Sequence, residues 1–169
     1  MTMDRLWAGW RSEYIEDVTA PSSGTPRTSV FRRILESGLD DEETHIVWRG
    51  ALTFVILNRY PYISGHVLVM PYREVSDLEA LTPDEHTELW STVTDAVRAI
   101  KTAYNSDGMN IGVNLGTAGG AGVPDHLHVH VMPRWNADSN FMTSVAETRV
   151  LPEALPVTWR KLRDAWPQR

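Results

Sequence analysis

Three histidines alternate with apolar residues in the segment 125–135, and this pattern constrains the fold more than any other feature of the chain. His126, His128 and His130 are half of the six histidines in the sequence. Side chains on a β-strand alternate between its two faces, so a strand here buries Leu and Val on one face and presents three imidazoles on the other. The segment therefore predicts a strand with a chemically reactive face.

Three interpretations of these imidazoles compete. A half-buried strand can carry histidines on its polar face without any function. Two histidines at this spacing can also share one zinc ion, with His45, His66, His86 or a carboxylate completing the ligands, while the absence of cysteine excludes thiolate ligands. Nucleophilic catalysis, in which neighbouring imidazoles handle protons and phosphate charge, accounts for all three positions. We favour this third interpretation.

The run from His126 to Met132 resembles the histidine triad motif, in which three histidines alternate with apolar residues and two apolar residues follow. Two further segments resemble the same family. Residues 6–15 read Leu-Trp-x-x-Trp-Arg-x-x-Tyr-Ile, which is similar to the opening of a bacterial branch associated with diadenosine tetraphosphate cleavage. Residues 57–71 resemble the segment that meets the nucleotide ribose. The resemblance covers about residues 5–166.

This resemblance implies a nucleotidyl hydrolase or transferase that cleaves dinucleoside polyphosphates through a covalent nucleotidyl-histidine intermediate. It makes His128 the nucleophile, with His130 supplying hydrogen-bond donors and His126 orienting its neighbours. Phosphate or water serves as the second nucleophile. Two alternatives stay open, a nucleoside phosphoramidase of the same family and a nucleotide-binding sensor or adaptor with little catalysis. The intact triad favours an enzyme.

Candidate substrate-binding residues lie outside the triad. By the resemblance, Asn58 is a ribose ligand and His66 a neighbour of the triad. A glycine-rich stretch precedes the triad and can form a backbone nest for phosphate. Asn114 is expected to contact phosphate or ribose, and Arg134 offers a planar cation to phosphate oxygens. The candidates in the glycine-rich stretch are Gly120, Ala121, Gly122 and Val123.

We expect no required cofactor. Many bacterial relatives carry Cys-x-Phe-Cys, half of a structural zinc site, where this chain has Ser29 and Arg32. The sequence therefore predicts no bound metal. A divalent cation is expected only in association with the polyphosphate of the substrate.

Composition limits the partners and the compartment. A net charge of −6 argues against nucleic acid as a partner, because such binding depends on a basic surface. No N-terminal stretch is apolar and long enough for a signal peptide or a membrane span, so we expect a cytoplasmic protein without a membrane partner. The expected ligand is a small-molecule nucleotide. The resemblance implies a homodimer, and some members of this branch form higher homo-oligomers.

The remaining pattern predicts an α+β fold. Thr82, Pro83 and Glu85 form a helix start with a capping box, and apolar residues at spacings of three and four follow. Ser29 is a good N-cap for a short helix. We expect an antiparallel sheet of about five strands, one long helix and a C-terminal helix, which is the histidine triad fold. The expected strands are 45–49, 53–58, 66–71, 109–114 and the triad segment.

We expect one domain spanning residues 1–169, a length that suits a single globular core. Residues 1–28 form an N-terminal aromatic segment and a flexible connector. Residues 29–151 form the core, and residues 152–169 form the C-terminal helix.

Overall fold

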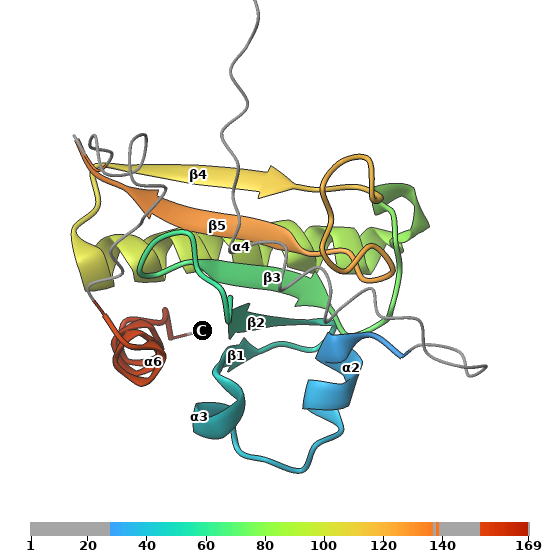
Figure 1. The fold of residues 1–169 in the computed structure, drawn as a ribbon, viewed down its shortest axis with the longest axis horizontal. Helices are drawn as coiled ribbons and strands as arrows, with labels where there is room; N and C mark the ends of the chain where they lie inside the picture. The colour runs from blue at the N-terminus through green and yellow to red at the C-terminus, as the bar shows by residue number, and fades with distance from the viewer. Residues whose placement is uncertain (1–27, 137, 139–152, 169) are drawn as a thin grey trace, which may run out of the picture.

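A five-stranded antiparallel sheet forms the centre of the protein (Figure 1). The computed structural model describes residues 28–136, residue 138 and residues 153–168. The strands lie in the order β1-β2-β3-β5-β4, and each neighbouring pair is antiparallel. The predicted α+β fold with an antiparallel sheet is confirmed. The strands are β1 (Ile46–Arg49), β2 (Thr53–Leu57), β3 (Val67–Pro71), β4 (Gly108–Val113) and β5 (Val129–Arg134).

The long helix α4 (Pro83–Tyr104) covers one face of the sheet (Figure 1). It begins where the sequence predicts, because the Thr82 hydroxyl accepts from the amide of Glu85 and the Glu85 carboxylate accepts from the amide of Thr82. It ends at Tyr104, and the next residue, Asn105, adopts the left-handed conformation common after helices. The apolar side chains that α4 buries against the sheet include Leu89, Val93, Ala96 and Ile100.

Shorter helices complete the described part of the chain. The predicted helix after Ser29 is α2, and the predicted C-terminal helix is α6. Residues 1–27, which carry most of the predicted aromatic segment and connector, lie outside the described residues. None of the helices in the described ranges is both long enough and apolar enough to cross a membrane. The shorter helices are α2 (Val30–Leu35), α3 (Asp41–Thr44), the 3₁₀ turn η1 (Leu78–Ala80) and α6 (Leu155–Asp164).

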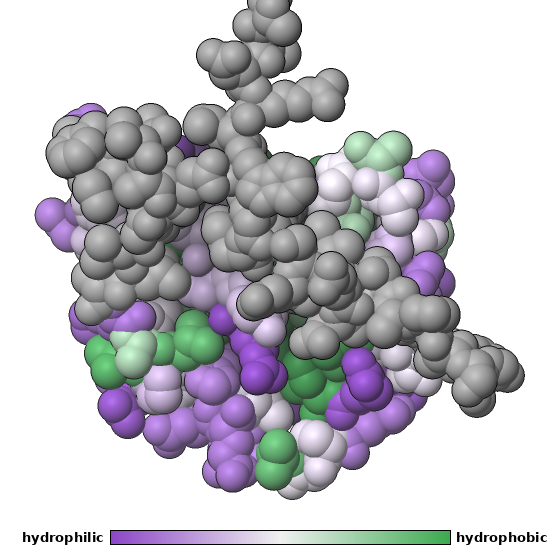
Figure 2. All heavy atoms as spheres, in the orientation of Figure 1, coloured by the Kyte–Doolittle hydropathy of each residue, from purple (hydrophilic) through white to green (hydrophobic). Residues whose placement is uncertain are grey.

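Apolar side chains cover both faces of the central strands. Leu127, Val129 and Val131 pack on the face that α4 covers. Phe31 of α2 and Leu68 of β3 belong to a second apolar cluster on the opposite face. Because β2 and β3 are buried on both faces, their sequences are continuous runs of buried residues. Outside, hydrophilic side chains occupy most of the described surface seen in Figure 2, with smaller hydrophobic patches between them.

The strand that carries the triad is shorter than the sequence predicts. Within β5 lies only one of the three histidines, His130. The amide of Leu127 donates to the carbonyl oxygen of Val75 at 2.6 Å and not to β3. In addition, Pro71, the last residue of β3, has no N–H to donate to a carbonyl of the triad segment. The other two triad histidines therefore lie in the segment that leads into β5, and the prediction of a strand through the whole triad is wrong.

Candidate active site

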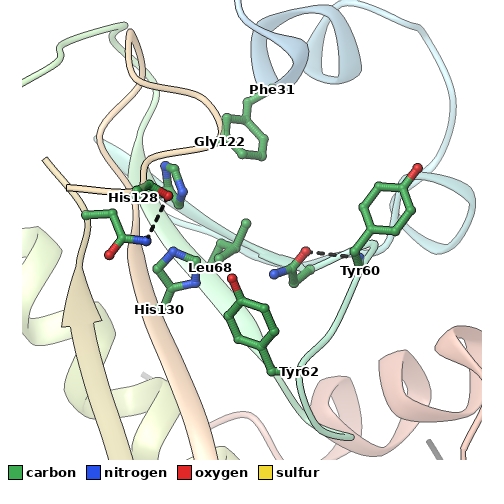
Figure 3. A pocket seen from close by; sticks show the side chains of 10 residues that line it. Phe31, Tyr60, Tyr62, Leu68, Gly122, His128 and His130 are labelled. Atoms are coloured by element: carbon green, nitrogen blue, oxygen red, sulfur yellow. Dashed lines mark hydrogen bonds between the residues drawn. The ribbon is translucent and has the colours of Figure 1, made fainter. Parts of the chain in front are cut away.

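A pocket lies beside the histidines, on the sheet face opposite α4. It contains about 470 Å³ of space, part of it open to solvent. In Figure 3, His128 and His130 line one side, Tyr60 lies across from them, and Leu68 lies between. Two of the three triad histidines thus share a pocket. Its lining consists of Phe31, Asn58, Tyr60, Tyr62, Leu68, Asn114, Gly120, Gly122, His128 and His130.

His128 enters this pocket with a defined tautomer. Its Nδ1 lies 2.7 Å from the carbonyl oxygen of His126. A carbonyl oxygen only accepts hydrogen bonds, so Nδ1 carries the ring proton and Nε2 of the neutral ring keeps its lone pair. Burial lowers the pKa of the His128 imidazole, which favours the neutral ring at pH 7. A neutral imidazole with a free lone pair is the form that attacks phosphorus.

A chain of hydrogen bonds gives His130 the opposite tautomer. The backbone amide of Tyr62 donates to Nδ1 of His66 at 3.2 Å, so the proton of neutral His66 lies on Nε2. That Nε2 lies 2.9 Å from Nδ1 of His130 and donates to it. The proton of His130 therefore lies on its own Nε2. His128 can donate a lone pair, whereas His130 can donate a proton in a hydrogen bond.

Burial also makes the free energy of unfolding depend on the protonation state of His66. Its pKa is lowered to about 3, first by burial and then by the neighbouring His130 and His128. The unfolded chain binds a proton near the ordinary value of 6.5. Protons therefore favour the unfolded state as the pH falls from 6.5 toward 3, and this part of the stability is fully present above pH 6.5.

We expect the free energy of unfolding, measured with urea, to lose about 2 kcal/mol through His66 between pH 7 and pH 5. His66→Gln removes the titrating ring, so its unfolding free energy is expected to change less with pH than that of the wild type. Equal pH slopes for the two proteins would contradict the buried, neutral state of His66.

His126 lies beneath the pocket and does not line it. The ring is fully buried. Its Nδ1 lies 2.8 Å from Oγ of Ser29, and its Nε2 lies 2.8 Å from the carbonyl oxygen of Pro71. Since both ring nitrogens are bonded within the protein, His126 acts on a substrate only through its neighbours. This arrangement is compatible with the predicted orienting role.

The glycine-rich loop reaches the pocket with only part of the predicted set. Gly120 and Gly122 line the pocket, but Ala121 and Val123 do not. The amide of Gly120 donates to the carbonyl of Thr117 at 3.0 Å, and the amide of Ala121 donates to the carbonyl of a loop glycine at 3.2 Å. Val123 is buried in the second apolar cluster. The loop thus uses two of the four predicted amides, those of Gly120 and Ala121, to hold its own turn. Fewer amides are therefore left for phosphate than the sequence predicts.

Both predicted asparagines line the pocket. Asn58 follows β2, where its Oδ1 accepts from the amide of Tyr60 at 3.0 Å and its Nδ2 lies 3.3 Å from Nδ1 of His66. Asn114 follows β4, and its Nδ2 donates to the carbonyl of Gly120 at 3.4 Å. Each asparagine is thus held by hydrogen bonds to neighbouring residues of the pocket. The contacts of both side chains with ribose or phosphate stay predictions.

Arg134 does not reach the pocket. Its guanidinium forms a two-pronged pair with the carboxylate of Asp138, and its Nη1 donates to Oδ1 of Asn110 at 2.8 Å. Arg134 ends β5, so the rise along the strand separates it from the triad. The phosphate contact of Arg134 stays a prediction, and this arrangement does not support it.

Four lining residues were missing from the sequence prediction: Phe31, Tyr60, Tyr62 and Leu68. Phe31 packs against His128, with ring centroids 5.5 Å apart. Tyr62 stacks on His66 at 5.0 Å. The only signal in the sequence was the pair of tyrosines in the turn-rich stretch before His66, and it does not reveal which way the rings face.

The described residues do not fit a zinc site. In the ranges that the structure describes, no group of three or more His, Cys, Asp or Glu side chains is arranged to hold a metal ion. The nitrogens of His126 are bonded to Ser29 and to the carbonyl of Pro71. A zinc ligand needs a nitrogen lone pair that is not already committed to a hydrogen bond.

Comparisons with known proteins point to one family. The sequence model of the HIT domain family matches residues 40–137 of this chain. The chain is 41% identical to the AP-4-A phosphorylase of Mycobacterium tuberculosis (strain ATCC 25618 / H37Rv), over 97% of this chain and 85% of that protein. It is 38% identical to the asymmetrical bis(5'-nucleosyl)-tetraphosphatase of Schizosaccharomyces pombe, over 56% of this chain and 52% of that protein.

Solved structures share the fold. A Zn-bound histidine triad family protein from Mycobacterium smegmatis superposes with a TM-score of 0.67 and 26% identity, covering 82% of this chain and 92% of that one. A Hit-like protein from Bartonella henselae gives a TM-score of 0.67 at 19% identity, covering 84% of this chain and 99% of that one. The second likeness concerns the fold alone.

Proposed function

Because the chain belongs to the histidine triad (HIT) family, we propose that it cleaves dinucleoside polyphosphates such as diadenosine tetraphosphate through a nucleotidyl group carried on His128. One observation carries this proposal. The hydrogen bond from Nδ1 of His128 to the carbonyl of His126 leaves the Nε2 lone pair as the nucleophile in the pocket. The named activities of the M. tuberculosis and S. pombe relatives support the substrate class.

The reaction has two displacements. Nε2 of His128 attacks the α-phosphorus of diadenosine tetraphosphate, the P–N bond forms, and the P–O bond to ATP breaks with its electron pair leaving on ATP. The ring becomes cationic, and its Nδ1–H keeps the hydrogen bond to the carbonyl of His126. A second nucleophile then attacks the same phosphorus and breaks the P–N bond. His128 returns to its neutral tautomer.

Hydrogen-bond donors are needed to stabilise the negative charge on the phosphoryl group that is transferred. Phosphoryl transfer spreads negative charge over the non-bridging oxygens, so donors held in place around them lower the barrier. The Nε2–H of His130 is one such donor, since Nδ1 of that ring is held by His66. Gly122 brings backbone to the same pocket. The ring and the loop together support binding of the α-phosphate next to His128.

We propose phosphate as the second nucleophile. The similarity to a named phosphorylase extends over 97% of this chain, whereas the similarity to the tetraphosphatase covers 56%. Phosphate attack releases ADP beside ATP, while water releases AMP beside ATP. The test is to incubate the protein with diadenosine tetraphosphate, with and without inorganic phosphate, and to identify the nucleotides. ADP formed only with phosphate supports a phosphorylase, and AMP formed equally in both reactions identifies a hydrolase.

We propose that neither step needs a bound metal. We expect protein dialysed against a chelator and assayed with added Mg²⁺ to keep full activity, since a divalent cation is needed only on the polyphosphate. Elemental analysis of the same protein is expected to give no stoichiometric zinc. Activity that returns only with zinc, together with one zinc per chain, would contradict this proposal.

We also propose that two copies pair through β4. At the other edge of the sheet, α6 covers β1, where Trp159 Nε1 donates to the carbonyl of Ile46 at 2.8 Å. Arg163 Nη1 donates to the carbonyl of Val47 at 3.4 Å. Within the described residues, β4 pairs only with β5, and its Ile111 is 47% exposed. Strands with an open edge pair readily with a second copy.

Light scattering tests this assembly. We expect the wild type to have the mass of a dimer or of a higher assembly built from dimers, and Ile111→Lys to lower the mass to that of one chain. Val157→Lys changes a similarly exposed residue on α6 and should leave the mass unchanged. A monomeric wild type would contradict pairing through β4.

A further inference from the structure

Ser29 connects the start of α2 to the triad. The residue is buried, and its Oγ lies 2.8 Å from Nδ1 of His126. The same oxygen accepts a hydrogen bond from the amide of Arg32 at 3.2 Å, as an N-cap does. The hydroxyl proton is therefore not used by the helix cap, and two acceptors face it, Nδ1 of His126 and the carboxylate of Glu74.

The second nitrogen of His126 confirms the direction of this bond. Its Nε2 lies 2.8 Å from the carbonyl oxygen of Pro71, which only accepts, so Nε2 carries the proton. Burial lowers the pKa of the His126 imidazole and favours the neutral ring. In a neutral ring with a proton on Nε2, Nδ1 is an acceptor for Ser29. The ring of His126 is thus held between α2 and the end of β3.

Two more contacts tie the start of α2 to this region. Phe31 meets His126 edge-on, with centroids 5.4 Å apart and planes at 90°, and it also packs on His128. The amide of Ser29 donates to Oε1 of Glu74 at 2.5 Å. Hydrogen bonding by Ser29, first through its side chain and then through its amide, lowers the pKa of the Glu74 carboxyl, which keeps this acceptor ionised. The first turn of α2 is therefore fixed both to the triad and to the segment after β3.

We propose that Ser29 is a positioning residue for the nucleophile. Its hydroxyl donates to Nδ1 of His126 and holds the orientation of that ring, and the carbonyl of His126 in turn holds Nδ1 of His128 at 2.7 Å. Ser29 itself does not line the pocket. It acts on the attacking Nε2 through two intervening hydrogen bonds. The kinetic part of this proposal rests on the proposed cleavage reaction, whereas its structural part does not.

Three variants test the kinetic part. Ser29→Ala removes the hydroxyl and is expected to lower kcat about tenfold, as loss of one buried hydrogen bond does when it aims a reacting group. KM should stay within about twofold, because no pocket contact is lost. Ser29→Thr restores a hydroxyl and a cap, and should restore kcat. Ser37→Ala removes a hydroxyl bond at the other end of α2 and should leave both constants unchanged.

Nitrogen NMR of the histidine rings tests the structural part without turnover. We expect the wild type to show His126 protonated on Nε2 and His128 protonated on Nδ1. We expect Ser29→Ala to keep the Nε2 proton of His126, which the carbonyl of Pro71 still holds, and to shift the Nδ1 signal because that nitrogen loses its hydrogen-bond donor. A wild-type His126 protonated on Nδ1 would overturn the proposal even if the alanine variant fails to fold. Wild-type kcat in Ser29→Ala would overturn it as well. Absent turnover in the wild type instead refutes the proposed reaction, while the tautomers still test the positioning of His126.

Discussion

His128→Ala is expected to lower kcat for diadenosine tetraphosphate by at least about four orders of magnitude, the scale seen when a covalent nucleophile is removed. The variant lacks the nitrogen that forms the P–N bond, so the first displacement does not take place. The other pocket histidine cannot replace it, because its Nδ1 is bonded to His66 and its Nε2 carries a proton. Substrate affinity should change little by comparison.

Trapping the intermediate provides the measurement. Wild-type protein quenched in denaturant during turnover should carry a labelled AMP group that is lost in acid and stable in base, as expected for a phosphorus–nitrogen bond. His128→Ala should carry none. His86→Ala, which removes an exposed histidine from α4, is the matched control and should retain both adduct and turnover. An adduct of normal yield in His128→Ala would show that another residue is the nucleophile.

The fold was predictable where the sequence pattern is local. Thr82 and Glu85 define the start of α4 within four residues of each other, and the structure has the capping box there. The start of β5 was not predictable, since it depends on a partner far away in sequence. Leu127 bonds to Val75, and Pro71 offers no amide to the ladder. Alternation in the sequence shows which face a side chain joins, but not where strand pairing stops.

The candidate site shows the same division. His128 and His130 follow from one short motif, and the pocket contains both. The inward-facing amide of Ala121 does not follow from composition, because a glycine-rich loop can turn its N–H groups to a ligand or to itself. Phe31 has the spacing of a core residue in a short helix, and only the packing of α2 on the sheet shows that it also borders the pocket.

His130→Ala is expected to lower kcat by about 10²- to 10³-fold, the cost of losing one fixed donor to a transition-state oxygen. The hydrogen bond from His66 fixes the proton on Nε2 of His130, so the ring meets the substrate as a donor. His130→Gln offers an amide N–H at a similar distance from the backbone. If His130 acts only as a hydrogen-bond donor, glutamine should recover a large part of the lost rate.

Single-turnover kinetics separate this role from proton transfer. Appearance of the AMP adduct measures the first displacement directly, and its rate should rank wild type, His130→Gln and His130→Ala in that order. A glutamine side chain cannot give up a proton to the leaving nucleotide. Equal losses in the two variants would therefore contradict the donor role and identify His130 as the acid of the first step. Partial recovery by glutamine, with an unchanged pH dependence of adduct formation, is the result that the hydrogen bonding of His66 and His130 predicts.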